Sequence, residues 1–291
     1  MNVVTEPHRP YYIPNPSPYP VVLSGALFLL GLGAALRVNA LTAGWWVLGA
    51  GALLAVYVLF AWFGRVIGES RAGVYGLQED RAFRWGMLWF ITSEVVFFAS
   101  LFGVLFYERN IAVPWLASFN APHSALAPFS PWPHFTAQWP NGGPAGQGFE
   151  VVNPWGIPAL NTLLLLSSGV TVTWAHAGLR AGRRTQLKAG LALTIALGVT
   201  FLGFQLHEFS EAYRVLGLTL HSGVYGATFF ILTGFHGLHV TIGAIMLAAM
   251  LARTWRGDFT PENHFAFEAV TWYWHFVDVV WLMLFVFVYW L

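Results

Sequence analysis

The last membrane-length stretch of the chain, residues 268–291, is apolar but carries three ionisable side chains: Glu268, His275 and Asp278. Their spacings of seven and three residues place them on one face of a helix. An ionisable group at bilayer depth is costly, so this face should meet protein, bound lipid or water rather than hydrocarbon. Carboxyl and imidazole groups in such a row could relay protons, so all three are candidates for proton handling.

A fourth candidate, Glu94, lies near the middle of a second apolar segment, WFITSEVVFFASLF. Its helical neighbours include Phe90, Ile91 and Phe98, and apolar surroundings favour the neutral acid over the carboxylate. Two interpretations follow. The acid either bonds a nearby carbonyl or hydroxyl in a purely structural role, or it takes part in proton handling or conformational gating.

The segment TGFHGLHVTIG holds a histidine pair, His236 and His239, one helical turn apart. Such a pair could bind a metal or haem, but a functional centre normally needs three or four ligands. No HExxH motif, second close histidine pair or Glu-x-x-His motif accompanies it. The pattern favours histidines that bond across helices at a close-packed interface, beside Gly234, Gly237 and Gly243. We predict no metal site and no catalytic residue in this chain.

Further polar side chains lie at the ends of apolar segments. Glu208 and Glu211 share a face beside His207, and their boundary position favours a hydrogen-bonding or salt-bridge role over a paired-carboxylate acid–base site. His176 is expected at the membrane interface beside a basic cluster, where anionic lipid head groups could bind. The candidates for lipid binding are Arg65, Arg180, Arg183, Arg184, His239, Arg253 and Arg256.

The elements that must position these residues are transmembrane helices. Hydrophobic residues make up 57% of the chain and charged residues 9%, far from the average of a soluble domain. Spans of about 20 apolar residues predict an all-α integral membrane protein with seven transmembrane helices. These spans are residues 21–38, 43–64, 85–107, 157–178, 188–207, 223–252 and 268–291.

Basic residues in the loops predict the orientation, because they accumulate on the inner side of the membrane. With the N-terminus inside and the C-terminus outside, the outer side holds only Arg37, Arg109 and Arg214. The inner side then holds Arg9, Arg65, Arg71, Arg81, Arg84, Arg180, Arg183, Arg184, Lys188, Arg253 and Arg256. The predicted order is a Pro-rich inner segment (1–20), two helices (21–64), a basic inner loop (65–84), and five helices within 85–291.

Between the third and fourth helices, residues 108–156 form a long outer loop rich in Pro, Gly, Trp and Phe. Loops of this length are uncommon unless they are functional, disordered or packed on a partner. The aromatic residues favour packing at the membrane surface or against another subunit, and an insertion without a role is the alternative.

The absence of cysteine excludes thiolate metal sites, dithiol redox pairs and disulfides. A net charge of +1 gives no indication of nucleic-acid binding. Several prolines precede the first apolar span, so we expect a stiff extended lead-in rather than a cleavable signal peptide.

Long motifs in the same order resemble the subunit III family of cytochrome c oxidase, the haem-copper terminal oxidase of aerobic respiration. They are NPSPYP, FITSEVVFF, PALNTLLLLSSGVTVTWAH, EFSEAY, YGATFFILTGFHGLHVTIGA and NHFAFEAVTWYWHFVDVVWL. The chain departs from the family pattern after its second span, at residues 64–69 and near Tyr75 and Gly76. Head-group contacts of the family on that side are therefore not carried over.

The resemblance implies a two-helix bundle and a five-helix bundle that enclose a V-shaped cleft filled by phospholipid. It also implies a non-redox subunit that stabilises subunit I and supports proton uptake, with the family's carbodiimide-reactive carboxylate falling on Glu94. Haems and copper would belong to the partner subunits I and II, and cytochrome c would interact only indirectly.

Two functions from other classes are alternatives to this subunit of a proton-pumping oxidase. A proton-coupled transporter would use Glu94, Glu268, His275 and Asp278 as a relay, but inverted repeats and broken helices are missing. A histidine-box oxygenase would need more histidines. Within the family, subunit III of a quinol oxidase is usually shorter by two spans. Ala, Gly and Arg usage favours a bacterial inner membrane over a mitochondrial one.

Overall fold

The computed structural model describes residues 12, 15–119, 128, 130, 132–144, 146 and 148–291. Parts of the Pro-rich segment 1–20 and of the outer loop, together with Arg9, lie outside the described residues. The chain divides into two compact units, the first ending at Phe83 and the second beginning at Arg84.

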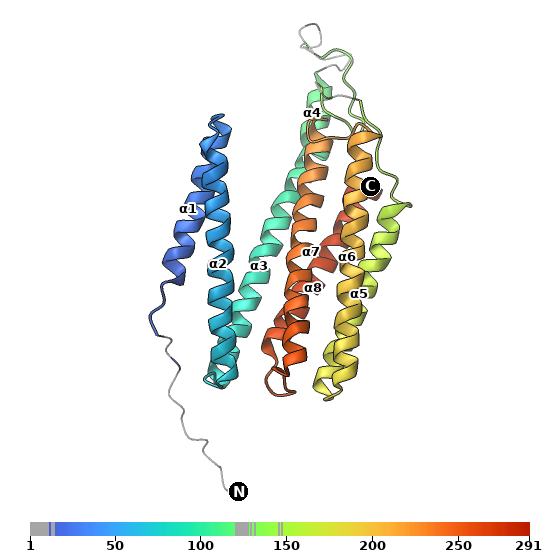
Figure 1. Cartoon of the computed structure of the whole chain (residues 1–291). Coiled ribbons are helices and arrows are strands. Elements are labelled where there is room, and N and C mark those ends of the chain that lie inside the picture. The colour runs from blue at the N-terminus through green and yellow to red at the C-terminus, as the bar shows by residue number, and fades with distance from the viewer. Residues whose placement is uncertain are drawn as a thin grey trace. The chain divides into compact units, whose positions relative to one another are not determined.

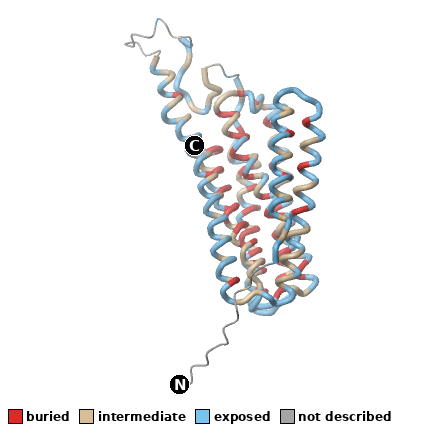
Figure 2. Tube along the Cα trace, turned by 90° about the vertical axis from the view of Figure 1, so that its left-hand side faces the viewer, coloured by how far each residue is buried: buried red, intermediate tan, exposed pale blue. Residues whose placement is uncertain are grey.

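The first unit is built on an antiparallel hairpin of α1 (Tyr19–Val38) and α2 (Ala43–Arg71) (Figure 1). The two helices approach closely at glycines. A Cβ added at Gly33 would lie 2.6 Å from the backbone nitrogen of Leu48, so only glycine fits there. Most large side chains of the hairpin remain exposed, whereas buried residues concentrate in the second unit (Figure 2).

The predicted basic loop 65–84 is largely helical, because α2 continues to Arg71 and α3 begins at Leu77. Tyr75, in the short turn between them, donates a hydrogen bond to Glu69 Oε2 at 2.7 Å. Burial and the neighbouring Glu69 charge raise the pKa of Tyr75 above its ordinary value. Glu69 also pairs with Arg65 at 3.1 Å, so this turn is held by a network of three polar side chains.

The second unit contains most of α3 (Leu77–Tyr107) and a closed ring of four helices. In this ring α6 contacts α5 and α7, while α8 contacts α7 and α5. Phe90 of α3 stacks on Tyr273 of α8, with ring centroids 6.1 Å apart. The remaining bounds are η1 (Glu108–Ala112), α4 (Val113–Ser118), α5 (Ile157–Arg180), α6 (Arg184–Arg214), α7 (Val224–Arg256), α8 (Phe265–Leu284) and η3 (Phe285–Trp290).

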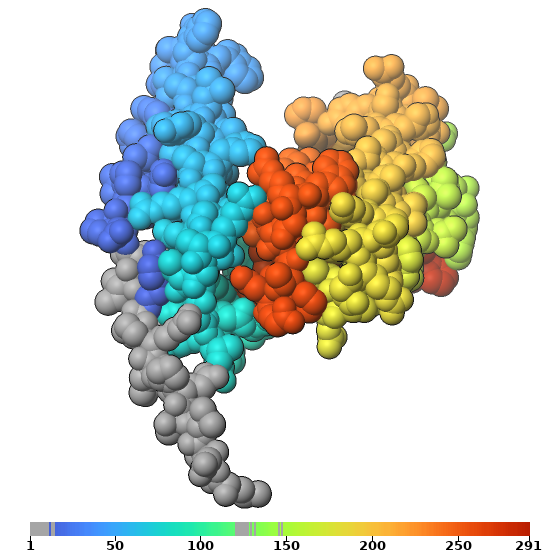
Figure 3. Space-filling model, turned by 60° about the horizontal axis from the view of Figure 1, so that its bottom comes forward, coloured from blue at the N-terminus to red at the C-terminus, as the bar shows by residue number. Residues whose placement is uncertain are grey.

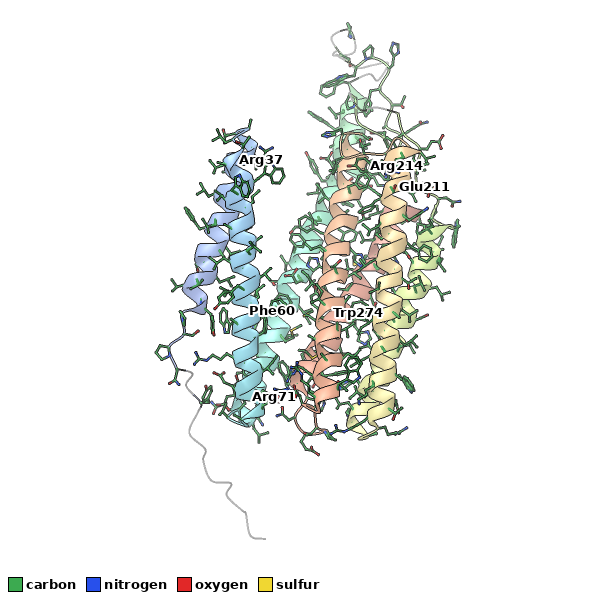
Figure 4. The ribbon with its side chains drawn as sticks, in the orientation of Figure 1. Arg37, Phe60, Arg71, Glu211, Arg214 and Trp274 are labelled. Carbon is green, nitrogen blue, oxygen red and sulfur yellow. The ribbon has the colours of Figure 1, made fainter. Side chains whose placement is uncertain are left out.

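Trp274 of α8, labelled in Figure 4, is fully buried within this ring of helices. Cβ atoms added at Gly198 and Gly243 would lie 2.7 and 2.8 Å from its indole ring, so both glycines make room for it. Its Nε1 donates a hydrogen bond to Ser168 Oγ at 2.8 Å. One side chain thus contacts α5, α6 and α7, which fixes how these helices pack.

Within the described residues, seven helical stretches are long and apolar enough to cross a membrane, which confirms the predicted fold class. Most helices extend beyond the predicted spans. For example, α6 begins at Arg184 rather than residue 188 and ends at Arg214 rather than residue 207. The grouping into two and five helices agrees with the two compact units, and the lipid-filled cleft stays a prediction.

The loop 108–156, which we predicted on the outer side, begins as helix, with η1 and α4, before it becomes irregular. Its described part packs on the second unit's own α7. Phe149 stacks on Tyr225 with ring centroids 5.5 Å apart, and Trp139 meets the same ring edge-on at 5.7 Å. The loop aromatics thus cover the start of α7 in this chain.

Candidate functional site

The central polar contact of the second unit joins Glu94 of α3 to His239 of α7. Glu94 Oε2 lies 2.9 Å from His239 Nε2, and both side chains are largely buried. The partner of Glu94 is thus an imidazole on another helix. The alternative in which Glu94 has a purely structural role expected a nearby carbonyl or hydroxyl instead. The predicted bonding of His236 and His239 across helices is confirmed.

The hydrogen bonds of His239 limit the protonation states of this pair. Its Nδ1 lies 2.6 Å from the Phe235 carbonyl oxygen, which can only accept, so Nδ1 carries a proton. Nε2 then either donates to a carboxylate or accepts from the neutral acid. One proton is therefore shared between Glu94 and His239, in an ion-pair or a neutral form.

Aromatic rings enclose the pair. Phe98 meets the His239 ring at 5.1 Å, and Tyr273 stacks on it at 6.4 Å between centroids. Low-dielectric walls strengthen the interaction of the shared proton with its two partners. His239 is therefore no longer a candidate for lipid binding. Both of its ring nitrogens have partners, and it lies halfway along α7, away from the helix ends.

Glu268 and His275 share a helix face, as predicted, but the structure gives them different partners. Arg84 of α3 binds Glu268 Oε1 at 2.6 Å, and its guanidinium lies over the Phe265 ring. Glu268 is thus tied to α3 at the end of the bundle where α8 begins.

His275 and Asp278 face α5 instead. Their Nδ1 and Oδ2 atoms lie 3.5 Å apart, and His275 Nε2 lies 3.1 Å from Thr173 Oγ1. Gly169 of α5 leaves the space that the Asp278 carboxylate occupies, since a Cβ there would clash with Oδ2. The three ionisable side chains predicted as one row therefore belong to two separate pairs, Arg84–Glu268 and His275–Asp278.

His236 is fully buried and lies 3.3 Å from the Val277 carbonyl oxygen of α8. Three glycines were expected at this interface, and of these only Gly243 packs closely against other side chains, those of Trp274 and Tyr273. Gly234 and Gly237 face open space, because they lie on other sides of α7.

Glu208, near the C-terminal end of α6, is more deeply buried than its predicted position at a membrane boundary indicated. It is 2% exposed and accepts a hydrogen bond from the Tyr289 hydroxyl of η3. Glu211, predicted on the same face, is exposed and lies near the C-terminal end of α6, as does Arg214 (Figure 4). The two carboxyls therefore do not form an acid–base pair, and Glu208 has the hydrogen-bonding role.

Comparison with known proteins identifies the family of this chain. A family model described as cytochrome c oxidase subunit III matches residues 9–291. The chain belongs to the cytochrome c oxidase subunit III family. Proteins named "Cytochrome c oxidase subunit 3" are similar over nearly their full length. The one from Marchantia polymorpha is 41% identical, covering 99% of this chain and 98% of the relative. The one from Sus scrofa is 40% identical, covering 99% of both.

Among cytochrome c oxidase subunits, those with redox centres need clustered metal ligands. The described part of this subunit III chain contains no group of three or more His, Cys, Asp or Glu side chains arranged to hold a metal.

The basic candidates for lipid binding in this subunit III chain differ in their surroundings. Arg180, Arg183, Arg184 and Arg256 are exposed. We predicted that Arg253 contacts lipid head groups, but its side chain is buried. It pairs with Asp258 at 3.3 Å and lies over the Phe259 ring, so it does not face lipid. Arg65 pairs with Glu69 in the first unit and remains partly exposed.

Proposed function

We propose that this chain is the non-redox subunit III of a proton-pumping cytochrome c oxidase. In this function it stabilises subunit I, binds phospholipid and supports proton uptake while oxygen is reduced by haems and copper in subunits I and II. Cytochrome c interacts with it only indirectly. The observation that carries the proposal is the 2.9 Å contact between Glu94 Oε2 and His239 Nε2 in an aromatic enclosure, where the two groups can share a proton.

A shared proton can move between carboxyl and imidazole with small displacements of its two partners. Because Glu94 lies on α3 and His239 on α7, the protonation state of the pair is coupled to the packing of these helices. Glu268, His275 and Asp278 are proposed to modulate proton supply in the same unit.

Replacing Glu94 with Gln should leave assembly, haem content and initial oxygen consumption near wild type. The amide is similar in volume and can still hydrogen-bond His239 Nε2, so helix packing is retained. Labelling by a hydrophobic carbodiimide, measured by mass spectrometry of the subunit, should disappear. Asp278→Asn is the matched control and should keep the label at Glu94. Loss of haem in Glu94→Gln would contradict a modulatory role.

The exposed arginines of the α5–α6 turn are proposed to bind anionic lipid head groups. A cavity of about 260 Å³ is lined by Arg184 together with Thr254 and Pro261 from the region of the α7–α8 turn. Figure 3 shows these two turns side by side at one end of the unit. Positive charge at this surface attracts anionic lipid by on the order of 1 kcal/mol per basic residue.

Neutralising Arg180, Arg183 and Arg184 together, each to Gln, should reduce the number of phospholipids retained by the native oxidase. Native mass spectrometry of the intact complex measures this number. Arg214→Gln, an exposed arginine at the opposite end of α6, is the control and should retain all of them. Equal lipid retention in both variants would mean that the arginines serve only to orient the chain.

The chain is a multi-pass membrane protein. We propose that its N-terminus lies inside and its C-terminus outside, on the distribution of basic residues. The preference for a bacterial inner membrane is likewise kept as a proposal, since the relatives reported above are eukaryotic.

A further inference from the structure

A group of buried polar side chains lies inside the second unit, where the C-terminal part of α6 meets η3. The Tyr289 hydroxyl donates a hydrogen bond to Glu208 Oε1, and Gln205 Nε2 lies 3.4 Å from the same oxygen. Gln205 Nε2 also lies 3.5 Å from the Tyr289 hydroxyl oxygen. Glu208 is 2% exposed and Gln205 is 3% exposed. This group shares no residue with the Glu94–His239 pair.

Asn161 of α5 lies at the same level as Gln205 of α6. The buried residues of each helix form one stripe with a seven-residue repeat, and these stripes contain Asn161 and Gln205. The hydroxyl oxygens of Thr171 and Thr194, 2.7 Å apart, give the register of the two antiparallel helices. Asn161 comes ten residues before Thr171, and the residue ten after Thr194 is the one before Gln205. Because both helices rise equally per residue, these two amides lie opposite each other.

Trp281 of α8 connects Asn161's part of α5 with η3. Its Nε1 donates a hydrogen bond to Thr162 Oγ1, next to Asn161, at 2.9 Å. The same indole lies 5.8 Å from the Tyr289 ring, and Phe229 of α7 meets that ring edge-on at 5.4 Å. Aromatic side chains therefore surround the polar group.

Four buried atoms of these side chains have no hydrogen-bond partner among the described residues. They are Asn161 Oδ1, Asn161 Nδ2, Gln205 Oε1 and Glu208 Oε2. Buried polar atoms are normally paired, so such a set indicates a bound ligand. The set includes oxygens that accept and an amide that donates. A cation would serve only the oxygens and an anion only the amide, whereas water both donates and accepts.

The surroundings of Glu208 favour the neutral acid. Among the described residues, the charge that acts on it is that of Glu211, which has the same sign. The other titratable groups that face it are the hydroxyls of Tyr225 and Tyr289. A buried carboxylate without a cationic partner is costly. Both donors contact Oε1, so the acid proton belongs on Oε2, from which it can be donated to water.

We propose that Asn161, Gln205 and Glu208 form a binding site for internal water, with Glu208 as a neutral acid that donates to the bound water. Because Tyr289 holds the other carboxyl oxygen, the water and the acid together connect α5, α6 and η3. The site is a further feature of the chain, and it does not depend on the proton and lipid functions proposed above.

A structure of the intact oxidase at a resolution that shows ordered water tests the site. Water density should lie within hydrogen-bond distance of Glu208 Oε2 and of the Asn161 or Gln205 amide. Asn161→Leu, which has the same branched shape without polar atoms, should lose this density. Thr200→Val, at an exposed position on α6, is the control and should keep it. If these atoms bond directly to protein in the wild-type structure, with no water between them, the proposal is wrong, whether or not Asn161→Leu assembles.

Infrared spectroscopy of the intact oxidase tests the protonation of Glu208. The difference between wild type and Glu208→Gln should contain the carbonyl stretch of a neutral carboxylic acid. Glu211→Gln is the matched control, because Glu211 is exposed one helical turn further along α6, and it should lose carboxylate bands instead. Carboxylate bands in the Glu208→Gln difference would overturn the neutral acid and with it the proposed donation to water.

Discussion

An oxidase from which this subunit has been removed is expected to keep its haem spectrum and its initial rate of oxygen reduction, but to inactivate after fewer turnovers. In the proposed function this chain carries no redox centre, and electron transfer takes place in subunits I and II. We propose that its influence acts through subunit I, by lipid packing and by charged side chains at the proposed inner surface that shape local proton supply. Oxygen consumption followed to completion, with pH-dependent proton uptake, measures both effects.

Proton uptake in the depleted enzyme should be slower than in the intact enzyme, most clearly at alkaline pH, where free protons are scarce. Adding the wild-type chain back should restore the number of turnovers. A depleted complex that loses its haems at once contradicts this account. So does one that completes as many turnovers as the intact enzyme.

Replacing Trp274 with Ala is expected to give the largest loss of stability of any single substitution considered for the second unit. The indole is fully buried between Gly198 and Gly243 and bonds Ser168, so its removal leaves a cavity shared by four helices. Loss of a core tryptophan costs about 3–5 kcal/mol in soluble proteins. We expect about 3 kcal/mol here, because lipid rather than water surrounds the bundle. Thermal unfolding in detergent measures the effect.

Trp46→Ala is the control for this substitution, because Trp46 is 84% exposed on α2. Its unfolding temperature should stay within a few degrees of wild type. The unfolding temperature of Trp274→Phe should lie between those of Trp274→Ala and Trp46→Ala. This variant keeps most of the packing but loses the hydrogen bond, which is worth about 1 kcal/mol. Equal stability of Trp274→Ala and Trp46→Ala would show that Trp274 is not the centre of the core.

The sequence by itself determined the class of the protein and the number of its membrane-spanning helices. A bilayer requires about 20 apolar residues for each helical span and leaves no alternative for the backbone polar groups, so hydropathy predicts the spans directly. Helical periodicity also placed Glu268 and His275 on one face of their helix. Long motifs such as FITSEVVFF indicated the family that the comparisons then established.

The tertiary structure alone decided which polar groups meet. Periodicity gives the face of a residue but not the helix that lies opposite, and that choice depends on packing between residues far apart in the chain. Glu94 therefore pairs with His239, which lies 145 positions along the chain, and not with a local carbonyl. Arg253 turns inward to Asp258 instead of meeting lipid. Glu268 and His275 have different partners although they share a helix face. Glu268 binds Arg84 of α3, whereas the Asp278 carboxylate beside His275 occupies the space that Gly169 leaves on α5.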